Sequence, residues 1–394
     1  PVLFLGYLPP VNRMCRIGSR PHEQPSYPAE VLHCPACHLV QLGLTVDPCI
    51  LFPADYPYTS GTTRILRENF AELAGECEAL IGLAPDDLVV DIGSTDGTLL
   101  SNFAPRCQVQ GITPENVGRE AAERGIPTLQ SYFHDKAVAE VLRWRGPARL
   151  VTATNVFAHI ENVHEVTRCI GSLLRPDGVF VSESHYLLPL VEGLQYDTVY
   201  HEHLRYYCLH SLLHLLRLHG LEVFHAKQIP THGGSIRVYA ARPGLHPVRD
   251  SVARLLELEA ARLLQPEVLA RFRERVVRSK LRLQALMLDL AERGQRVCAI
   301  GAPSRGSTLV NYVGLDAGMV AAVFEVKGSH KIGNYMPGTM IPILDEERLF
   351  AEQPDCALLL SWHIAAELMA SLRRKGYRGS FLIPLPDPRI VGPG

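Results

Sequence analysis

The segment Leu88-Val89-Val90-Asp91-Ile92-Gly93-Ser94-Thr95-Asp96-Gly97 decides the fold. Its first five residues form an apolar run of the length that a buried parallel strand needs. The glycines after this run let the backbone turn sharply, and we predict a helix that begins near Thr98. A glycine turn between a strand and a helix allows a ligand to approach the backbone closely. The sequence therefore predicts the first unit of an α/β domain with a ligand at its turn.

The ligand of this turn is predicted from its spacing. A dinucleotide fingerprint would read Gly-x-Gly-x-x-Gly, which is not found here. The turn instead suits a nucleoside with an amino-acid tail, as in S-adenosylmethionine, and the candidate contacts are Asp91, Gly93, Ser94, Asp96 and Gly97.

Further strands are predicted at 109–112, 150–153 and 179–183, with Leu174 to Gly178 as the turn before the last of them. The first of these strands ends at Thr113-Pro114-Glu115, and the second delivers Asn155 and His159 to the same edge. Strands alternate with helical segments, one of which runs from Thr63 to about Ile81. This alternation predicts a doubly wound sheet with ligands at the strand ends.

Composition narrows the class of protein. The chain has 394 residues, enough for two or three domains, and is 47% hydrophobic and 20% charged, as in ordinary globular proteins. A formal net charge of −2 argues against a nucleic-acid partner. No apolar run approaches a membrane span, and we expect no membrane partner. Ten cysteines without the spacing of a secreted framework predict a reducing cytoplasm.

Residues 1–62 are rich in proline, glycine and aromatic residues and lack periodicity, which predicts a small irregular domain. Cys34-Pro35-Ala36-Cys37 is one half of the two-pair spacing that holds a tetrahedral zinc ion. No second pair is completed at Cys15. Two interpretations stay open, a structural zinc with Cys34 and Cys37 among its ligands, or reduced cysteines without metal.

The segment Tyr196-Asp197-Thr198-Val199-Tyr200-His201-Glu202-His203 is dense in groups that handle protons. Single histidines are often hydrogen-bonded structural residues, but this density is hard to explain as core filling. The unperturbed pKa of a histidine, about 6.5, lies close to the working pH, as a general base requires. We therefore expect catalysis in this segment.

Residues 244–394 predict a second α/β unit behind a helical linker, Asp250 to Arg293, that is broken near Pro266. Strands are expected at 296–300, 321–324 and 357–361. One interpretation is a structural repeat of the first domain without a ligand. The other is that the glycine turn after Ile300, with Arg305, Lys327 and Lys331, binds a diphosphate.

The chain as a whole resembles the sugar C-methyltransferases that act on nucleotide-linked deoxysugars in antibiotic biosynthesis. The resemblance runs in order over nearly the whole chain and rests on these stretches: Cys34 to Leu42, Asp91 to Gly97, Asn155 to His159, Glu183 to Tyr186, Tyr196 to His203, His232 to Arg237, Gly301 to Leu309 and Pro337 to Pro342.

This resemblance implies a zinc-bearing domain at 1–62, a methyl-donor domain at 63–243 and a Rossmann-like domain at 244–394 that helps to hold the substrate. The fold class is thus α/β, with two Rossmann-like doubly wound domains and a small N-terminal domain. The implied cofactors are S-adenosylmethionine and structural zinc, and the implied substrate is a nucleotide sugar, with dTDP as the expected nucleotide.

The resemblance also implies roles for single residues. His203 is the expected general base, Tyr200 and Glu202 are its companions, and His159 and Tyr58 complete the sugar site. The base would deprotonate the carbon beside a 4-keto group, and the resulting enolate carbon would attack the sulfonium methyl. The other implied contacts are Thr113, Pro114 and Asn155 for the cofactor, and His185, Tyr186, His232, Gly234, Ser235 and Arg237 for the substrate.

Three positions depart from the family pattern. Only one cysteine pair is present, Thr95 stands where many relatives have Asn, and Thr113 stands where an acid commonly binds the ribose hydroxyls. Three interpretations of Thr113 stay open: a weaker affinity for the cofactor, compensation by Glu115, or a ribose that is held elsewhere. Two alternative functions stay open. One is a methyltransferase with an oxygen or nitrogen acceptor, and the other, which Thr113 supports, is a non-catalytic protein that binds sugar nucleotides.

Overall fold

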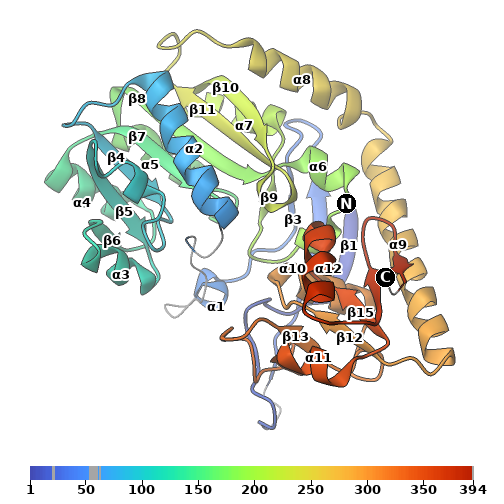
Figure 1. Ribbon diagram of the computed structural model, residues 1–394. Coiled ribbons are helices and arrows are strands. Elements are labelled where there is room, and N and C mark those ends of the chain that lie inside the picture. The colour runs from blue at the N-terminus through green and yellow to red at the C-terminus, as the bar shows by residue number, and fades with distance from the viewer. Residues whose placement is uncertain (20–22, 53–60, 62–63, 393–394) are drawn as a thin grey trace.

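The computed structural model describes residues 1–19, 23–52, 61 and 64–392, and three sheets are found within this part of the chain. In Figure 1 the largest sheet lies on one side and the C-terminal sheet on the other, with the N-terminal strands beside it. Tyr58 falls outside the described residues.

The central sheet has seven strands in the order β10-β11-β8-β7-β4-β5-β6. Neighbouring strands from β8 to β6 pair in parallel, whereas β11 is antiparallel to both β8 and β10. Its strands are β4 (Leu88–Ile92), β5 (Gln108–Thr113), β6 (Thr128–Gln130), β7 (Ala148–Thr154), β8 (Leu174–His185), β10 (Glu222–Ile229) and β11 (Ser235–Ala241).

Helices cover both faces of this sheet, because successive residues of each strand point to opposite faces. Val89 packs with Phe70 and Leu73 of α2 (Arg64–Ile81), whereas Val90 packs in the cluster on the other face. The other helical elements of this domain are η2 (Leu100–Asn102), α3 (Val117–Glu123), α4 (Asp135–Arg145), α5 (Val163–Leu173), α6 (Leu187–Glu192), η3 (Tyr196–Thr198), α7 (Leu209–Leu218) and η4 (Thr231–Gly233).

The N-terminal region is more regular than predicted. It forms a four-stranded antiparallel sheet in the order β1-β2-β3-β9, whose last strand comes from the central part of the chain. Its elements are β1 (Leu3–Leu8), β2 (Tyr27–His33), β3 (Val40–Leu42), α1 (Pro48–Leu51) and β9 (Arg205–Tyr206). Because β9 lies directly after His203, this sheet anchors the far end of the motif segment.

The C-terminal region forms a six-stranded sheet in the order β14-β13-β12-β15-β16-β17, parallel except for β17. Its elements are β12 (Val297–Ile300), α10 (Ser304–Val313), β13 (Val323–Glu325), β14 (Ile343–Asp345), α11 (Glu347–Glu352), β15 (Cys356–Leu359), η5 (Trp362–Ile364), α12 (Ala365–Arg374), β16 (Ser380–Ile383) and β17 (Arg389–Val391).

The helical linker is confirmed as α8 (Asp250–Arg262) and α9 (Val268–Glu292), which are interrupted around Pro266. Figure 1 shows the two helices running in an arc from the central sheet round to the C-terminal sheet. Leu283, Met287 and Leu290 of α9 are buried, so the linker is packed into the fold.

Two local predictions were wrong. No α-helix follows Gly97, because the chain continues through turns into the 3₁₀-helix η2. The turn predicted from Leu174 to Gly178 belongs to β8, since Leu174 pairs with Ala148 before a register shift. Among the described residues, none of the helices combines the length and the apolar character needed to cross a membrane.

Candidate active site

A cavity of about 640 Å³ lies at the strand ends of both α/β sheets. In the central sheet the strands that follow β4 are added first on one side of it (β5, β6) and then on the other (β7, β8), so the switch point lies between β4 and β7. In the C-terminal sheet the corresponding switch point lies between β12 and β15. Ligands of open α/β sheets bind at such switch points. Gly93 and Asn155 follow β4 and β7, Pro303 and His363 follow β12 and β15, and all four line the same cavity.

The glycine turn brings its backbone to the cavity wall at Gly93, where no side chain intervenes. Gly93 has φ of +71°, and a Cβ atom there would lie 2.8 Å from Cγ2 of Val156. Thr95 and Asn155 also adopt left-handed backbone conformations, with φ of +43° and +54°. Such conformations cost free energy in residues other than glycine and are frequent at ligand sites. Gly93, Thr95 and Asn155 all line the cavity.

Thr113, the departure at the ribose position, is fully buried and does not line the cavity. Its hydroxyl donates a short hydrogen bond to the carboxylate of Glu115. Pro114 and Glu115 both line the cavity. Thr113 thus holds the acid that stands two residues later in the chain.

His203 lines the cavity, and its Nδ1 lies 2.7 Å from the carbonyl oxygen of Thr198. A carbonyl oxygen can only accept, so Nδ1 carries the proton and the lone pair of the neutral ring is on Nε2. Burial lowers the pKa of His203 to about 4, with a smaller lowering by His232 and Arg305. The ring is therefore neutral at neutral pH, although its pKa lies well below the unperturbed value expected from the sequence.

Three further histidines line the cavity around His203. The ring centroids of His159 and His185 lie 5.0 Å and 4.9 Å from that of His203, and His232 lies 5.8 Å from His185. Burial holds the pKa values of His159 and His185 well below 6.5 and lowers that of His232 to about 4. Four neutral imidazoles therefore surround one part of the cavity.

Tyr200 and Glu202 join this cluster from the same segment as His203. The ring of Tyr200 lies 4.1 Å from that of His203. Glu202 is buried and accepts a hydrogen bond of 2.9 Å from Nδ2 of Asn12, in the N-terminal region. The predicted companions of His203 thus lie beside it in the structure.

On the C-terminal side, the prediction of a diphosphate site requires revision at two residues. Lys327 does not line the cavity, since it is exposed and pairs with Glu347. Arg305 does line it, but two of its guanidinium nitrogens bind the carboxylate of Asp197. Lys331 is the cavity-lining lysine of this turn, and its Nζ donates to the carbonyl of Ala302 at 2.6 Å.

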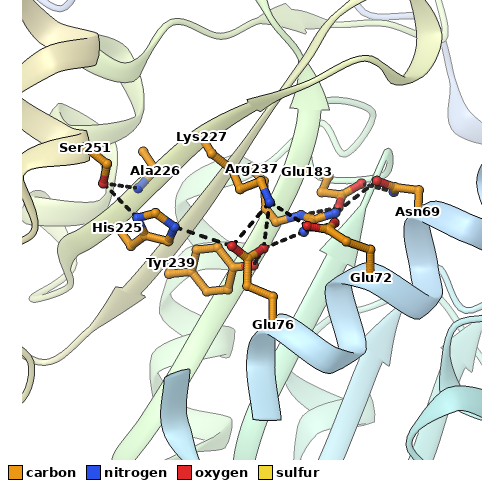
Figure 2. A network of polar contacts seen from close by, with 10 residues as sticks. All are labelled: Asn69, Glu72, Glu76, Glu183, His225, Ala226, Lys227, Arg237, Tyr239 and Ser251. Atoms are coloured by element: carbon orange, nitrogen blue, oxygen red, sulfur yellow. Dashed lines mark hydrogen bonds and ion pairs between the residues drawn. The ribbon is translucent and has the colours of Figure 1, made fainter. Parts of the chain in front are cut away.

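Arg237, expected to bind substrate, does not line the cavity. It belongs to a buried polar network, which Figure 2 shows. Its guanidinium donates to Glu183 at 2.5 Å, to both Glu72 and Glu76 at 2.6 Å, and to Asn69 at 2.9 Å. Glu72, Glu76 and Asn69 belong to α2. The network therefore fastens α2 to β8 and β11, and Phe70 of this helix lines the cavity.

Other predicted contacts also lie behind the cavity wall rather than on it. Asp91 is buried, accepts a 2.6 Å hydrogen bond from Thr152, and has its pKa raised by burial to about 7. Asp96 accepts from the backbone of Gly61 and of Thr98, so it shapes the turn. Gly234 packs on Pro189, where a Cβ atom would lie 2.6 Å from the proline ring. Ser94, Gly97, Tyr186 and Ser235 likewise do not line it.

The sequence does not by itself indicate several cavity residues. Ser131, Tyr132 and Phe133 follow β6, a three-residue strand too short to be recognised by its pattern. Thr198 and Phe70 also line the cavity. The position of Thr198 inside the motif segment was its only signal.

Zinc requires four ligands, usually cysteine or histidine. Cys34 and Cys37 are partly exposed and occupy one tight turn, in which the amide of His38 donates to the carbonyl of Cys34 at 2.9 Å. Among the described residues, no three side chains of His, Cys, Asp or Glu are grouped closely enough to hold a metal ion. The described residues therefore do not complete a zinc site.

The architecture agrees with family models over three consecutive parts of the chain. The model described as "Putative zinc binding domain" matches residues 1–52, a methyltransferase domain matches 58–226, and a C-methyltransferase C-terminal domain matches 230–386. These matches define the class as an S-adenosylmethionine-dependent methyltransferase.

The relative C-methyltransferase NovU of Streptomyces niveus is 34% identical over 372 residues, covering 93% of this chain and 88% of that protein. The chain therefore belongs to the C-methyltransferase family.

Solved structures similar to this chain cover about half of it. Magnesium protoporphyrin IX methyltransferase of Synechocystis PCC 6803, with bound SAH, is 15% identical, covers 47% of this chain and 90% of its own, and has a TM-score of 0.36. The PH0226 protein of Pyrococcus horikoshii OT3 is 15% identical, covers 50% and 96%, and has a TM-score of 0.37.

Proposed function

We propose that this enzyme transfers a methyl group from S-adenosylmethionine to the carbon beside the ketone of a nucleotide-diphosphate-linked 4-keto deoxysugar. The observation that carries the proposal is the tautomer of His203, whose Nδ1–H is committed to Thr198 while Nε2 keeps a lone pair. A methyltransferase acting on an amine or a hydroxyl has less need of a carbon base, because those acceptors carry lone pairs of their own.

The proposed cofactor site is the central-sheet side of the cavity. The left-handed backbone at Gly93, Thr95 and Asn155 opens room for the methionine end. Glu115, held by the hydroxyl of Thr113, faces this part of the cavity and would accept hydrogen bonds from the two ribose hydroxyls. Tyr132 and Phe133 offer aromatic surface for the adenine.

The proposed substrate site is the opposite side, with the sugar among the histidines and the diphosphate toward the C-terminal sheet. Lys331 and the first turn of α10, at Ser304, line that end. A lysine and the start of a helix both favour phosphate groups. The cavity would thereby hold donor and acceptor between two switch points.

In the proposed reaction, Nε2 of His203 removes the proton from the carbon beside the ketone, and the C–H electron pair forms the enolate. The enolate carbon attacks the methyl group, the carbon–sulfur bond breaks, and S-adenosylhomocysteine leaves. The proton on His203 then passes to solvent. Neutral imidazoles at His159, His185 and His232 can donate hydrogen bonds to the enolate oxygen, which stabilises developing charge.

The test is hydrogen exchange in deuterated water. A dTDP-linked 4-keto deoxysugar is incubated with enzyme and S-adenosylhomocysteine, and deuterium at the carbon beside the ketone is measured by mass spectrometry. We expect enzyme-dependent incorporation that His203→Gln abolishes, and methylated product when S-adenosylmethionine is supplied. Methylation of an oxygen or nitrogen, or product formation without exchange at carbon, would contradict the proposal.

A further inference from the structure

A buried ion pair joins the motif segment to the C-terminal sheet. Asp197 accepts hydrogen bonds from Nε and Nη2 of Arg305 at 2.7 Å and 2.8 Å. Asp197 is fully buried, and the side chain of Arg305 is 9% exposed. Such a bidentate contact fixes the relative orientation of the two side chains in addition to their electrostatic attraction.

Trp362 completes this contact from the end of β15. Its indole Nε1 donates to Asp197 at 2.7 Å, and the guanidinium carbon of Arg305 lies 4.8 Å from the ring centroid. The hydroxyl of Thr308, one turn along α10, donates to the carbonyl of Val199 at 3.2 Å. Residues 197–199 are thus held from the C-terminal domain directly before Tyr200, Glu202 and His203.

Arg305 also places a positive charge beside the histidine cluster. After burial and other neighbours, the field of Arg305 contributes to the lowered pKa values of His203, His185 and His232. Asp197 carries the opposite charge 2.7 Å from this guanidinium. Removing this carboxylate would therefore leave the charge of Arg305 without its direct counter-charge beside the base.

The other titratable and charged groups around His203 come from its own segment, from the central domain and from the C-terminal domain. Tyr200 and Glu202 share its segment, and His159 follows β7. His185 ends β8 and His232 lies in η4. Lys331 and His363 line the C-terminal part of the same cavity. Arg305 differs from these groups in that it forms an ion pair with Asp197, in the segment that carries His203.

We propose that Asp197 is a positioning residue, which uses Arg305 and Trp362 to lock the C-terminal domain onto the catalytic segment and shields His203 from the charge of Arg305. This role rests on the proposed function in taking His203 as the base. It also assigns Arg305 primarily to Asp197 rather than to a phosphate.

The test compares Arg305→Gln, Asp197→Asn and the double variant by NMR of protein labelled with ¹⁵N at histidine. The His203 signal is assigned from its loss in His203→Gln. Removing the cation should raise the pKa of His203 by about one unit or more, and removing the carboxylate should lower it. The double variant keeps a neutral hydrogen-bonded pair and should return to within about half a unit of wild type.

Activity supplies a second readout. Asp197→Asn should lower kcat by about 10- to 100-fold, since the base weakens, while the affinity for S-adenosylhomocysteine stays within about twofold. The double variant should recover part of kcat despite carrying two changes. A merely structural role predicts the reverse order, with the double variant worst.

Arg262→Gln is the matched control. Arg262 of α8 pairs with Glu192 at 2.7 Å and does not line the cavity, so this variant loses an ion pair without changing charge at the base. An unchanged pKa of His203 in Arg305→Gln, or a double variant no better than Asp197→Asn, would overturn the inference. The NMR titration needs no substrate, so it remains decisive if the keto-sugar assay itself fails.

Discussion

Nδ1 of His203 lies 2.7 Å from the carbonyl oxygen of Thr198, five residues earlier in the same segment. This contact holds the ring in one tautomer and leaves the lone pair on Nε2, the atom that accepts the proton in the proposed mechanism. Thr198 itself is placed by η3, where its amide and hydroxyl bond to the carbonyl of Gln195 at 3.1 Å and 2.8 Å. A short local turn therefore orients the proposed base.

The first prediction concerns this base. His203→Gln should lower kcat by about 10²- to 10⁴-fold, because general base catalysis typically contributes that much, and should leave binding of S-adenosylhomocysteine unchanged. Steady-state kinetics and calorimetric titration measure the two effects. His214→Gln, at an exposed position of α7, is the control and should behave as wild type.

The second prediction concerns pH and stability. Because burial lowers the pKa of His203 to about 4, the unfolded chain binds more protons at this residue than the folded chain between about pH 4 and 6.5. The contribution of His203 to the free energy of unfolding should therefore rise with pH in this window and level off above it.

Asp91 changes the free energy of unfolding in the opposite direction. Because burial raises its pKa to about 7, the folded chain binds more protons at Asp91 than the unfolded chain, and this contribution falls as pH rises. The histidine contribution is thus measured as a difference between wild type and His203→Gln. In urea unfolding at several pH values, the free energy of unfolding should rise less steeply with pH in His203→Gln than in wild type. The difference in slope should be up to about 1.4 kcal/mol per pH unit. Parallel curves would contradict a lowered pKa at His203.

The third prediction concerns the ribose. Glu115→Gln should weaken binding of S-adenosylhomocysteine by about 10- to 100-fold, because hydrogen bonds to a charged acceptor are worth about 1.5–3 kcal/mol. Thr113→Val, which frees the Glu115 carboxylate, should weaken it less. Both effects should vanish with an analogue that lacks the two ribose hydroxyls, and Glu120→Gln, exposed on α3, is the control.

The fourth prediction concerns Arg237. Arg237→Met leaves Glu183 buried without its ionic partner and should destabilise the protein by about 3–5 kcal/mol in urea unfolding. Arg64→Gln, which breaks the exposed pair with Glu68 at the start of the same helix α2, should cost less than about 0.5 kcal/mol. A stable Arg237→Met variant with a raised KM would restore the substrate-binding interpretation.

The sequence by itself determined several of the strands in the two α/β sheets. Val89 and Val90 belong to a short apolar run that is typical of a buried parallel strand, and the bounds of β4 were predicted to the residue. The break between α8 and α9 follows from the backbone restriction that Pro266 imposes on its neighbours. The crowding of Tyr200, Glu202 and His203 likewise predicted the residues that meet at the cavity.

Only the tertiary structure decided which polar residues face the cavity and which face one another. Arg237 and Arg305 look alike in the sequence as free cations, yet carboxylates from distant segments bind both of them in the fold. Local pattern carries no information on such pairing, because the partners are 54 and 108 residues away in the chain. Burial, which lowers the pKa of His203 to about 4, is also a property of the assembled domains and not of the segment alone.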